Sequence, residues 1–189
     1  MPFSPYAAQT PEIWLPSDAG LLDAASDPAL MNATASLVAG TLYLMRTVAK
    51  AQYVLAKNSW FVATSGVGGS TGSFTGVYDV NGNLLSGSAD IGAQLVAANQ
   101  QDMTLSTPVP IAAGQITYRA LLANLATTMP IMAVMDNNNT IRVNFGPNTS
   151  PSALLRASIN GTGLVALPGS IVPANNAQAA ALPLFWGAK

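Results

Sequence analysis

The sequence contains no cysteine and no histidine. Without cysteine there is no disulfide framework and no thiolate metal site, and the sequence leaves the redox compartment open. Without histidine the chain lacks the usual general base, the common catalytic triads and the commonest transition-metal ligand. Stability must therefore come from side-chain packing and backbone pairing.

Carboxylates are also scarce, because Glu12 is the only glutamate and lies near the N-terminus. A glycosidase needs two facing carboxyl groups. The stretch Asp79-Val80-Asn81-Gly82-Asn83 is similar to part of a calcium loop, but it lacks the further acidic ligands and the terminal glutamate. A hairpin turn explains it better, and Asp136 with the three asparagines after it favours a turn first and a metal or glycan contact second. We expect no catalytic residue, no metal site and no cofactor, and hence a protein that is not an enzyme.

Charge is sparse, with 8% charged residues and a net charge of −1. Nucleic-acid binding needs a basic face, so we expect no nucleic-acid partner. With 50% hydrophobic residues, a surface this poor in charge favours association, and we expect a homo-oligomer. Polar residues and Pro130 interrupt the most apolar stretch, 120–135, and no basic segment precedes an apolar run at the N-terminus. The sequence thus predicts neither membrane insertion nor a secretory signal.

Short β-strands separated by turn signals are predicted from residue 41 onward. The expected strands cover 41–50, 52–64, 74–85 as a hairpin, 102–106, 115–126, 131–135, 140–145 and 184–186. Asn81-Gly82 is typical of a type I′ hairpin turn. The glycine-rich stretch 65–73 is expected to be a flexible loop, because it lacks the Lys-Ser/Thr pair of a phosphate loop. Seven or eight strands at this spacing, with no strand–helix alternation, predict an all-β antiparallel sandwich or barrel.

A few segments carry weaker signals. Asp27-Pro28 favours the start of a short helix, and 153–157 favours one helical turn. Pro108 and Pro110 are expected to end the strand that precedes them. No turn signal separates the first two predicted strands, which indicates a bend or a switch from one sheet to another.

The first 18 residues form a proline-rich arm, followed by one domain over 19–189. The prolines of the arm exclude a regular helix or a central strand. The arm is too apolar for a solvated tail, and its candidate particle-anchoring residues are Phe3, Tyr6, Ile13 and Trp14. An arm that docks on a neighbouring protein and an arm that wraps over its own domain explain these residues equally well.

Two tryptophans are candidates for contact with a glycan or with an interface, because aromatic rings stack on sugars. They are Trp60 and Trp186. Core packing is the commoner fate of such residues. A carbohydrate-binding module that recognises cell-surface glycan is therefore the alternative function.

Five stretches together resemble a known virion domain. They are Gly40–Leu44, Gly76–Leu85, Pro108–Tyr118, Leu167–Ser170 and Phe185-Trp186. Their order, over roughly residues 15–189, resembles the jelly-roll structural proteins of tailed-bacteriophage virions, which form minor tail proteins, head fibres or capsid decorations. The resemblance implies a jelly-roll β-sandwich, a trimer, capsid or tail proteins as partners, contact with host-surface glycan, and a virion location after assembly in the host cytoplasm.

The resemblance carries over no catalytic or binding residue, because its motifs are turn and strand patterns. A complete tail fibre usually has a long repetitive shaft, and this sequence has none. The expected function is therefore that of a short accessory structural protein, such as a capsid decoration or head-fibre subunit.

Overall fold

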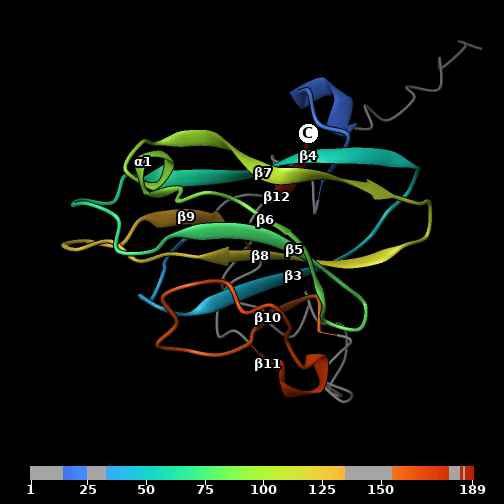
Figure 1. Ribbon diagram of the computed structural model, residues 1–189. Coiled ribbons are helices and arrows are strands. Elements are labelled where there is room, and N and C mark those ends of the chain that lie inside the picture. The colour runs from blue at the N-terminus through green and yellow to red at the C-terminus, as the bar shows by residue number, and fades with distance from the viewer. Residues whose placement is uncertain (1–14, 25–32, 135–154, 179–183, 185) are drawn as a thin grey trace, which may run out of the picture.

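Two antiparallel β-sheets packed face to face form the body of the protein, as Figure 1 shows. The computed structural model describes residues 15–24, 33–134, 155–178, 184 and 186–189. The all-β antiparallel sandwich that the sequence predicts is confirmed. Three predictions, namely the helix at Asp27-Pro28, the turn at Asp136 and the strand at 140–145, lie outside the described residues.

The described strands divide between the two sheets. Sheet A contains, in spatial order, β1 (Asp23–Ala24), β12 (Trp186–Ala188), β4 (Tyr53–Thr64), β9 (Ile131–Val134) and β2 (Ala33–Ser36), with β7 (Asn99–Ile111) on the other side of β4. Sheet B has the order β11 (Ala177–Gln178), β10 (Ala157–Ile159), β3 (Leu42–Val48), β8 (Ile116–Leu122), β5 (Phe74–Asp79) and β6 (Leu84–Gly87). The helices are η1 (Pro16–Ala19), α1 (Gly92–Leu95) and η4 (Pro173–Asn175).

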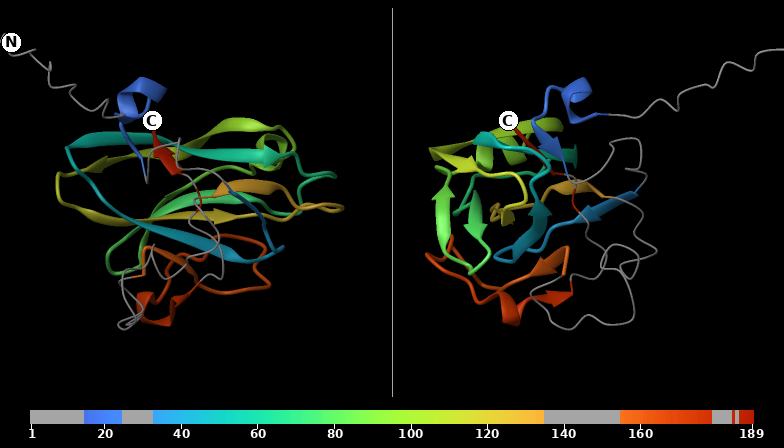
Figure 2. Two further views of the ribbon diagram at one scale, coloured as in Figure 1. Left: turned by 180° about the vertical axis from the view of Figure 1, so that it is seen from behind. Right: turned by 90° about the vertical axis from the view of Figure 1, so that its right-hand side faces the viewer.

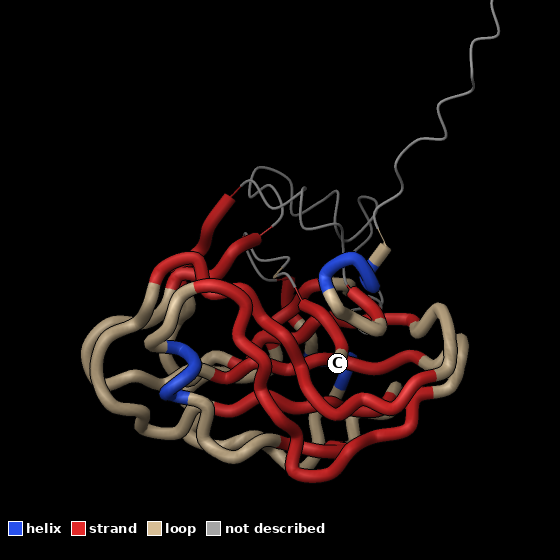
Figure 3. The backbone as a smooth tube through the Cα atoms, turned by 90° about the horizontal axis from the view of Figure 1, so that it is seen from above, coloured by secondary structure: helices blue, strands red, loops and turns tan. Residues whose placement is uncertain are grey.

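Strands β2 to β9 have the connectivity of a jelly roll. Their order is β2-β9-β4-β7 in sheet A and β3-β8-β5-β6 in sheet B. Successive strands change sheet at every connection except the β5–β6 hairpin, which gives the double Greek key of this fold. The switch expected between the first two predicted strands is the β3–β4 corner. Figure 3 shows the strands crossing at an angle when the sandwich is seen from above.

Apolar side chains cover both faces of sheet B, which makes the molecule three layers deep. Leu121 of β8 faces the core between the sheets, whereas Tyr118 and Leu122 face outward and pack against Ile171. Residues 160–176, which connect β10 to β11, thus form a third layer over sheet B, visible at the bottom of Figure 2. Tyr118, Ala120 and Leu122 thus share the outer face of β8, and Arg119 points into the core between the sheets.

The β5–β6 hairpin turns where the sequence predicts it, but the predicted type I′ turn is wrong, because that turn needs a positive φ at Asn81 as well as at Gly82 and Asn81 does not have one. Gly82 has a φ of 90°, which a residue with a side chain rarely adopts. The Asp79 carboxylate accepts hydrogen bonds from the backbone N–H of Asn81 at 2.9 Å and of Asn83 at 2.8 Å. Asp79 therefore stabilises the turn through its hydrogen bonds to the backbone.

Two local predictions are wrong. Strand β7 continues through Pro108 and Pro110, because Pro108 lies in a stretch of irregular register and β7 has a long ladder only with β4. The helical turn expected over 153–157 is not formed in its described part. Ala157 instead begins β10, which pairs with the edge of β3, so tertiary pairing overrides local helix propensity there.

Candidate functional site

Residues 15–24, which we call the arm root, are fixed to the last strand of the chain. Helix η1 ends at Gly20, whose φ of 65° allows the chain to reverse. The backbone N–H of Leu22 then donates to the carbonyl of Ala188 at 2.8 Å, and β1 pairs antiparallel with β12. Because β12 pairs with β4 at the centre of sheet A, the arm starts from a defined place on the sandwich, near the C-terminus in Figure 1.

A glycine in β12 makes room for the arm root. The Leu21 side chain is 3% exposed and lies over Gly187. A Cβ atom at Gly187 would lie 2.6 Å from Leu21 Cδ1, closer than any real contact. Glycine is therefore required for the root to pack in this position.

Two leucines of the arm root remain exposed although the backbone around them is hydrogen-bonded. Leu15 is 53% exposed and Leu22 is 55% exposed. Leu15 directly follows Ile13-Trp14 in the sequence, so the root continues the apolar character of the arm. The predicted anchor residues themselves, Phe3, Tyr6, Ile13 and Trp14, lie outside the described residues, and their role stays a prediction.

A buried charge network lies beneath the arm root. Arg119 is fully buried, and its Nη2 donates to the Tyr53 hydroxyl at 2.9 Å. The Tyr53 hydroxyl in turn donates to Asp23 Oδ2 at 3.5 Å, so the network connects β8 and β4 with β1. Arg119 Nε and Nη1 have no hydrogen-bond partner, and the guanidinium lies over the Trp186 ring.

Burial changes the titration of this network. It raises the pKa of Asp23 above its usual value, against the opposing effect of the Ala24 N–H and of positive Lys50 and Arg119. It lowers the pKa of Arg119 to about 10, so the guanidinium keeps its charge at neutral pH. The hydrogen bonds from Arg119 to Tyr53 and from Tyr53 to Asp23 thus hold the arm root against the sandwich.

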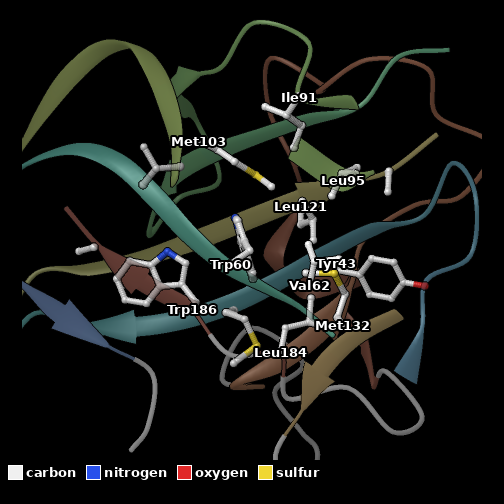
Figure 4. Packing of buried hydrophobic residues seen from close by; sticks show 14 of the residues in the cluster. Tyr43, Trp60, Val62, Ile91, Leu95, Met103, Leu121, Met132, Leu184 and Trp186 are labelled. Atoms are coloured by element: carbon white, nitrogen blue, oxygen red, sulfur yellow. The ribbon is translucent and has the colours of Figure 1, made fainter. Parts of the chain in front are cut away.

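Trp60 and Trp186 lie in the core, as Figure 4 shows, and both are fully buried. Trp60 Nε1 donates to Thr75 Oγ1 at 3.0 Å, and Trp186 Nε1 donates to Asn58 Oδ1 at 3.0 Å. Asn58 Nδ2 completes the network by donating to the same threonine oxygen at 3.0 Å. The expectation that these tryptophans contact a glycan or an interface does not fit their burial, because neither ring reaches the surface.

A second polar cluster, which the sequence does not predict, lies around Asp102 on β7. Lys189 Nζ lies 2.7 Å from Asp102 Oδ2, and Ser59 Oγ donates to Oδ1 at 2.7 Å. Burial alone would raise the pKa of Asp102, but the bonds from Lys189, Ser59 and Gln100 outweigh it and hold the pKa below its usual value. Ser59 is fully buried, and the lowered pKa of Asp102 makes this carboxylate a weak acceptor of the serine proton, so the arrangement favours a structural role. The cluster fastens the C-terminus to β7.

Within the described ranges, no three acidic, histidine or cysteine side chains gather as they would around a metal ion. No helix in that same part of the chain has the length and apolarity to cross a membrane.

Comparison of the chain with known protein families and with curated proteins finds no match in either. The surface formed by the arm root is the candidate functional site.

Proposed function

We propose that this chain is an accessory structural protein of a tailed-bacteriophage virion, of the capsid decoration, head fibre or minor tail type. It attaches to capsid or tail proteins through its N-terminal arm and forms a homo-oligomer, expected to be a trimer. Its place is the virion, after assembly in the host cytoplasm. Contact of the jelly roll with the host surface is a further part of the proposal.

The arm root is the observation that carries this proposal. A segment held by backbone pairing, by Leu21 and by the hydrogen bonds that link Asp23 through Tyr53 to Arg119 presents Leu15 and Leu22 to solvent. Exposed leucines on an ordered backbone favour a protein contact, because little chain entropy is lost when they are covered. The jelly-roll strand order agrees with the resemblance in the sequence, although a fold alone does not assign a function.

The attachment surface is tested by mixing purified protein with particles that lack it and measuring what sediments with them. Deletion of residues 1–14 leaves η1 and β1 in place and should abolish co-sedimentation. The double variant Leu15→Asp/Leu22→Asp should weaken it by tenfold or more, on the order expected for two apolar contacts. Val54→Asp is the matched control, because Val54 is 57% exposed and lies outside the arm root. Undiminished co-sedimentation of the deletion variant would overturn this assignment of the arm.

The carbohydrate-binding alternative is less well supported, because its two candidate rings, Trp60 and Trp186, are in the core. Its test is a glycan array probed with the whole protein. Binding to a host-envelope glycan would restore it as an additional role, with a recognition surface other than these two residues.

A further inference from the structure

The jelly-roll connectivity brings five connecting segments to one end of the sandwich, beside α1 on the left of Figure 1. We call this surface the loop end. It consists of residues 37–41, 65–73, 88–98, 123–130 and 160–166. Four of these segments join strands in opposite sheets, and the fifth belongs to the C-terminal layer.

Hydrogen bonds join the five segments into one platform. The Asn124 side chain donates through Nδ2 to the carbonyls of Gly72 and Leu164, each at 2.9 Å. Backbone bonds make the remaining links, from Gly40 N–H to Ala123, Thr71 N–H to Asn124, Gly66 N–H to Leu95 and Leu164 N–H to Gly40. A surface that is bonded together before a partner arrives loses little entropy on binding.

The glycines of 65–73 serve close packing, which differs from the flexible loop that the sequence predicts. A Cβ atom at Gly66 would lie 2.3 Å from Leu125 Cδ1, and one at Gly72 would lie 2.5 Å from the carbonyl oxygen of Val165. Gly72 also has a φ of 120°. These glycines therefore let neighbouring segments approach the loop, and the contacts fix its position.

The loop end presents aliphatic side chains to solvent from several segments at once. Val38 is 62% exposed, Val67 54%, Val96 38% and Val165 72%. Each of these valines belongs to a different segment of the platform. Scattered single apolar residues are ordinary on a surface, but several on one bonded platform indicate an interaction site.

The loop end carries almost no charge. Asp90 is its only ionisable residue, and its carboxylate accepts hydrogen bonds from Ser70 Oγ at 2.7 Å, Gly92 N–H at 2.8 Å and Ser73 N–H at 3.2 Å. Other described surfaces carry ionisable side chains, namely Lys50 and Asp79 at the opposite end and Lys57, Asp102 and Lys189 on sheet A. The loop end thus brings one carboxylate and no cationic side chain to a contact.

We propose that the loop end is a contact surface between copies of this chain. A patch that packs against a second copy of itself must not oppose like charges, and this patch brings only Asp90, which is already held by three donors. A strongly charged partner has no group of opposite charge to pair with among these residues. The same aliphatic surface of another copy is complementary to it in polarity. The inference rests on the homo-oligomer of the proposed function and deepens it, because it names the surface through which the copies meet.

The test uses the whole protein in solution without particles, so its result is independent of the attachment experiment. Sedimentation velocity over a wide concentration range should give a mass above the 19.3 kDa of one chain, falling toward that value on dilution. Val38→Asp and Val67→Asp, made separately, should each raise the dissociation constant about tenfold or more, since each places a carboxylate in an apolar contact. The matched control is again Val54→Asp, with an exposed valine on β4, and it should leave the constant unchanged.

Thermal unfolding of each variant checks that the fold is intact, which the exposure of both valines predicts. A wild-type protein that stays at the mass of one chain throughout the concentration range would overturn the proposal. So would an oligomer that Val38→Asp and Val67→Asp leave intact, or one that Val54→Asp weakens equally.

Discussion

The Arg119 guanidinium lies over the Trp186 ring, with its carbon 4.5 Å from the ring centre. Arg119 belongs to sheet B and Trp186 to the last strand of sheet A. The contact therefore joins the two sheets at the place where the arm root is held. It also replaces part of the solvation that a buried guanidinium loses.

Removal of this arginine should destabilise the whole domain. Arg119→Ala removes one of the two positive side chains near Asp23, breaks the hydrogen bond to Tyr53 and opens a cavity beside Trp186, so we expect a loss of about 3–5 kcal/mol in the free energy of unfolding. Urea denaturation measures it. Gln52→Ala, at an exposed position, is the control and should change stability by less than about 0.5 kcal/mol. An equal effect of the two substitutions would show that the buried network does not hold the sheets together.

The hydrogen bonds around Asn58 should be needed to fix both core tryptophans. Asn58→Ala removes the acceptor of Trp186 and a donor to Thr75, and we expect a loss of about 2–4 kcal/mol. Near-ultraviolet circular dichroism should weaken as the indole rings lose their fixed orientation. Asn175→Ala, at an exposed position, should leave spectrum and stability nearly unchanged. An unaltered spectrum in Asn58→Ala would contradict this account of the core.

A single methyl group should loosen the arm root. Gly187→Ala places a Cβ against Leu21, so Leu21 must leave its position while the sandwich persists. Hydrogen exchange of the Leu22 amide, which is bonded to Ala188, should become at least about tenfold faster, as expected when a local opening replaces a closed contact. Gly169→Ala is the matched control, because a Cβ there meets no atom within 4 Å. Unchanged exchange in Gly187→Ala would mean that the root does not depend on this close contact.

Stability should decrease in acid partly through Asp102. Its pKa is lower in the folded protein than its ordinary value of 3.8, so the folded state favours the ionised form. The resulting stabilisation is present above pH 3.8 and is lost as the pH falls through the folded pKa. Because the side chain is partly exposed and solvent screens its interactions, its share is less than about 1 kcal/mol. Asp102→Asn should therefore make the dependence of unfolding free energy on pH shallower below about pH 4. A slope identical to that of the wild type would exclude this role.

The sequence predicts the strands well where turn residues and alternation agree, as at the Asn81-Gly82 hairpin and in 116–122. It does not predict which face of β8 is the core, because apolar residues alternate there on a strand that is covered on both sides. The outer face of β8 is apolar because the C-terminal layer covers it, and the sequence around Tyr118 and Leu122 gives no local sign of that cover. For the same reason, the sequence does not indicate that Arg119 is a core residue.

The candidate site is only partly predictable from the sequence. The apolar arm is visible in its composition, but the pairing of β1 with β12 depends on residues at opposite ends of the chain. Likewise, the glycines of 65–73 indicate a loop, while their close contacts with Leu125 and Val165 exist only after the segments have come together. Long-range packing of this kind leaves no periodic signal in a single sequence.

We propose that the chain is a structural part of a virion, and quantitative mass spectrometry of purified particles is the direct test of this proposal. The particles are those of a phage that encodes the chain, purified by density gradient, with the major capsid protein as internal standard. The account predicts that the chain bands with the particles at a fixed ratio to that standard after washing in high salt. Its absence from intact particles, with all of the chain in the soluble fraction, would contradict the account.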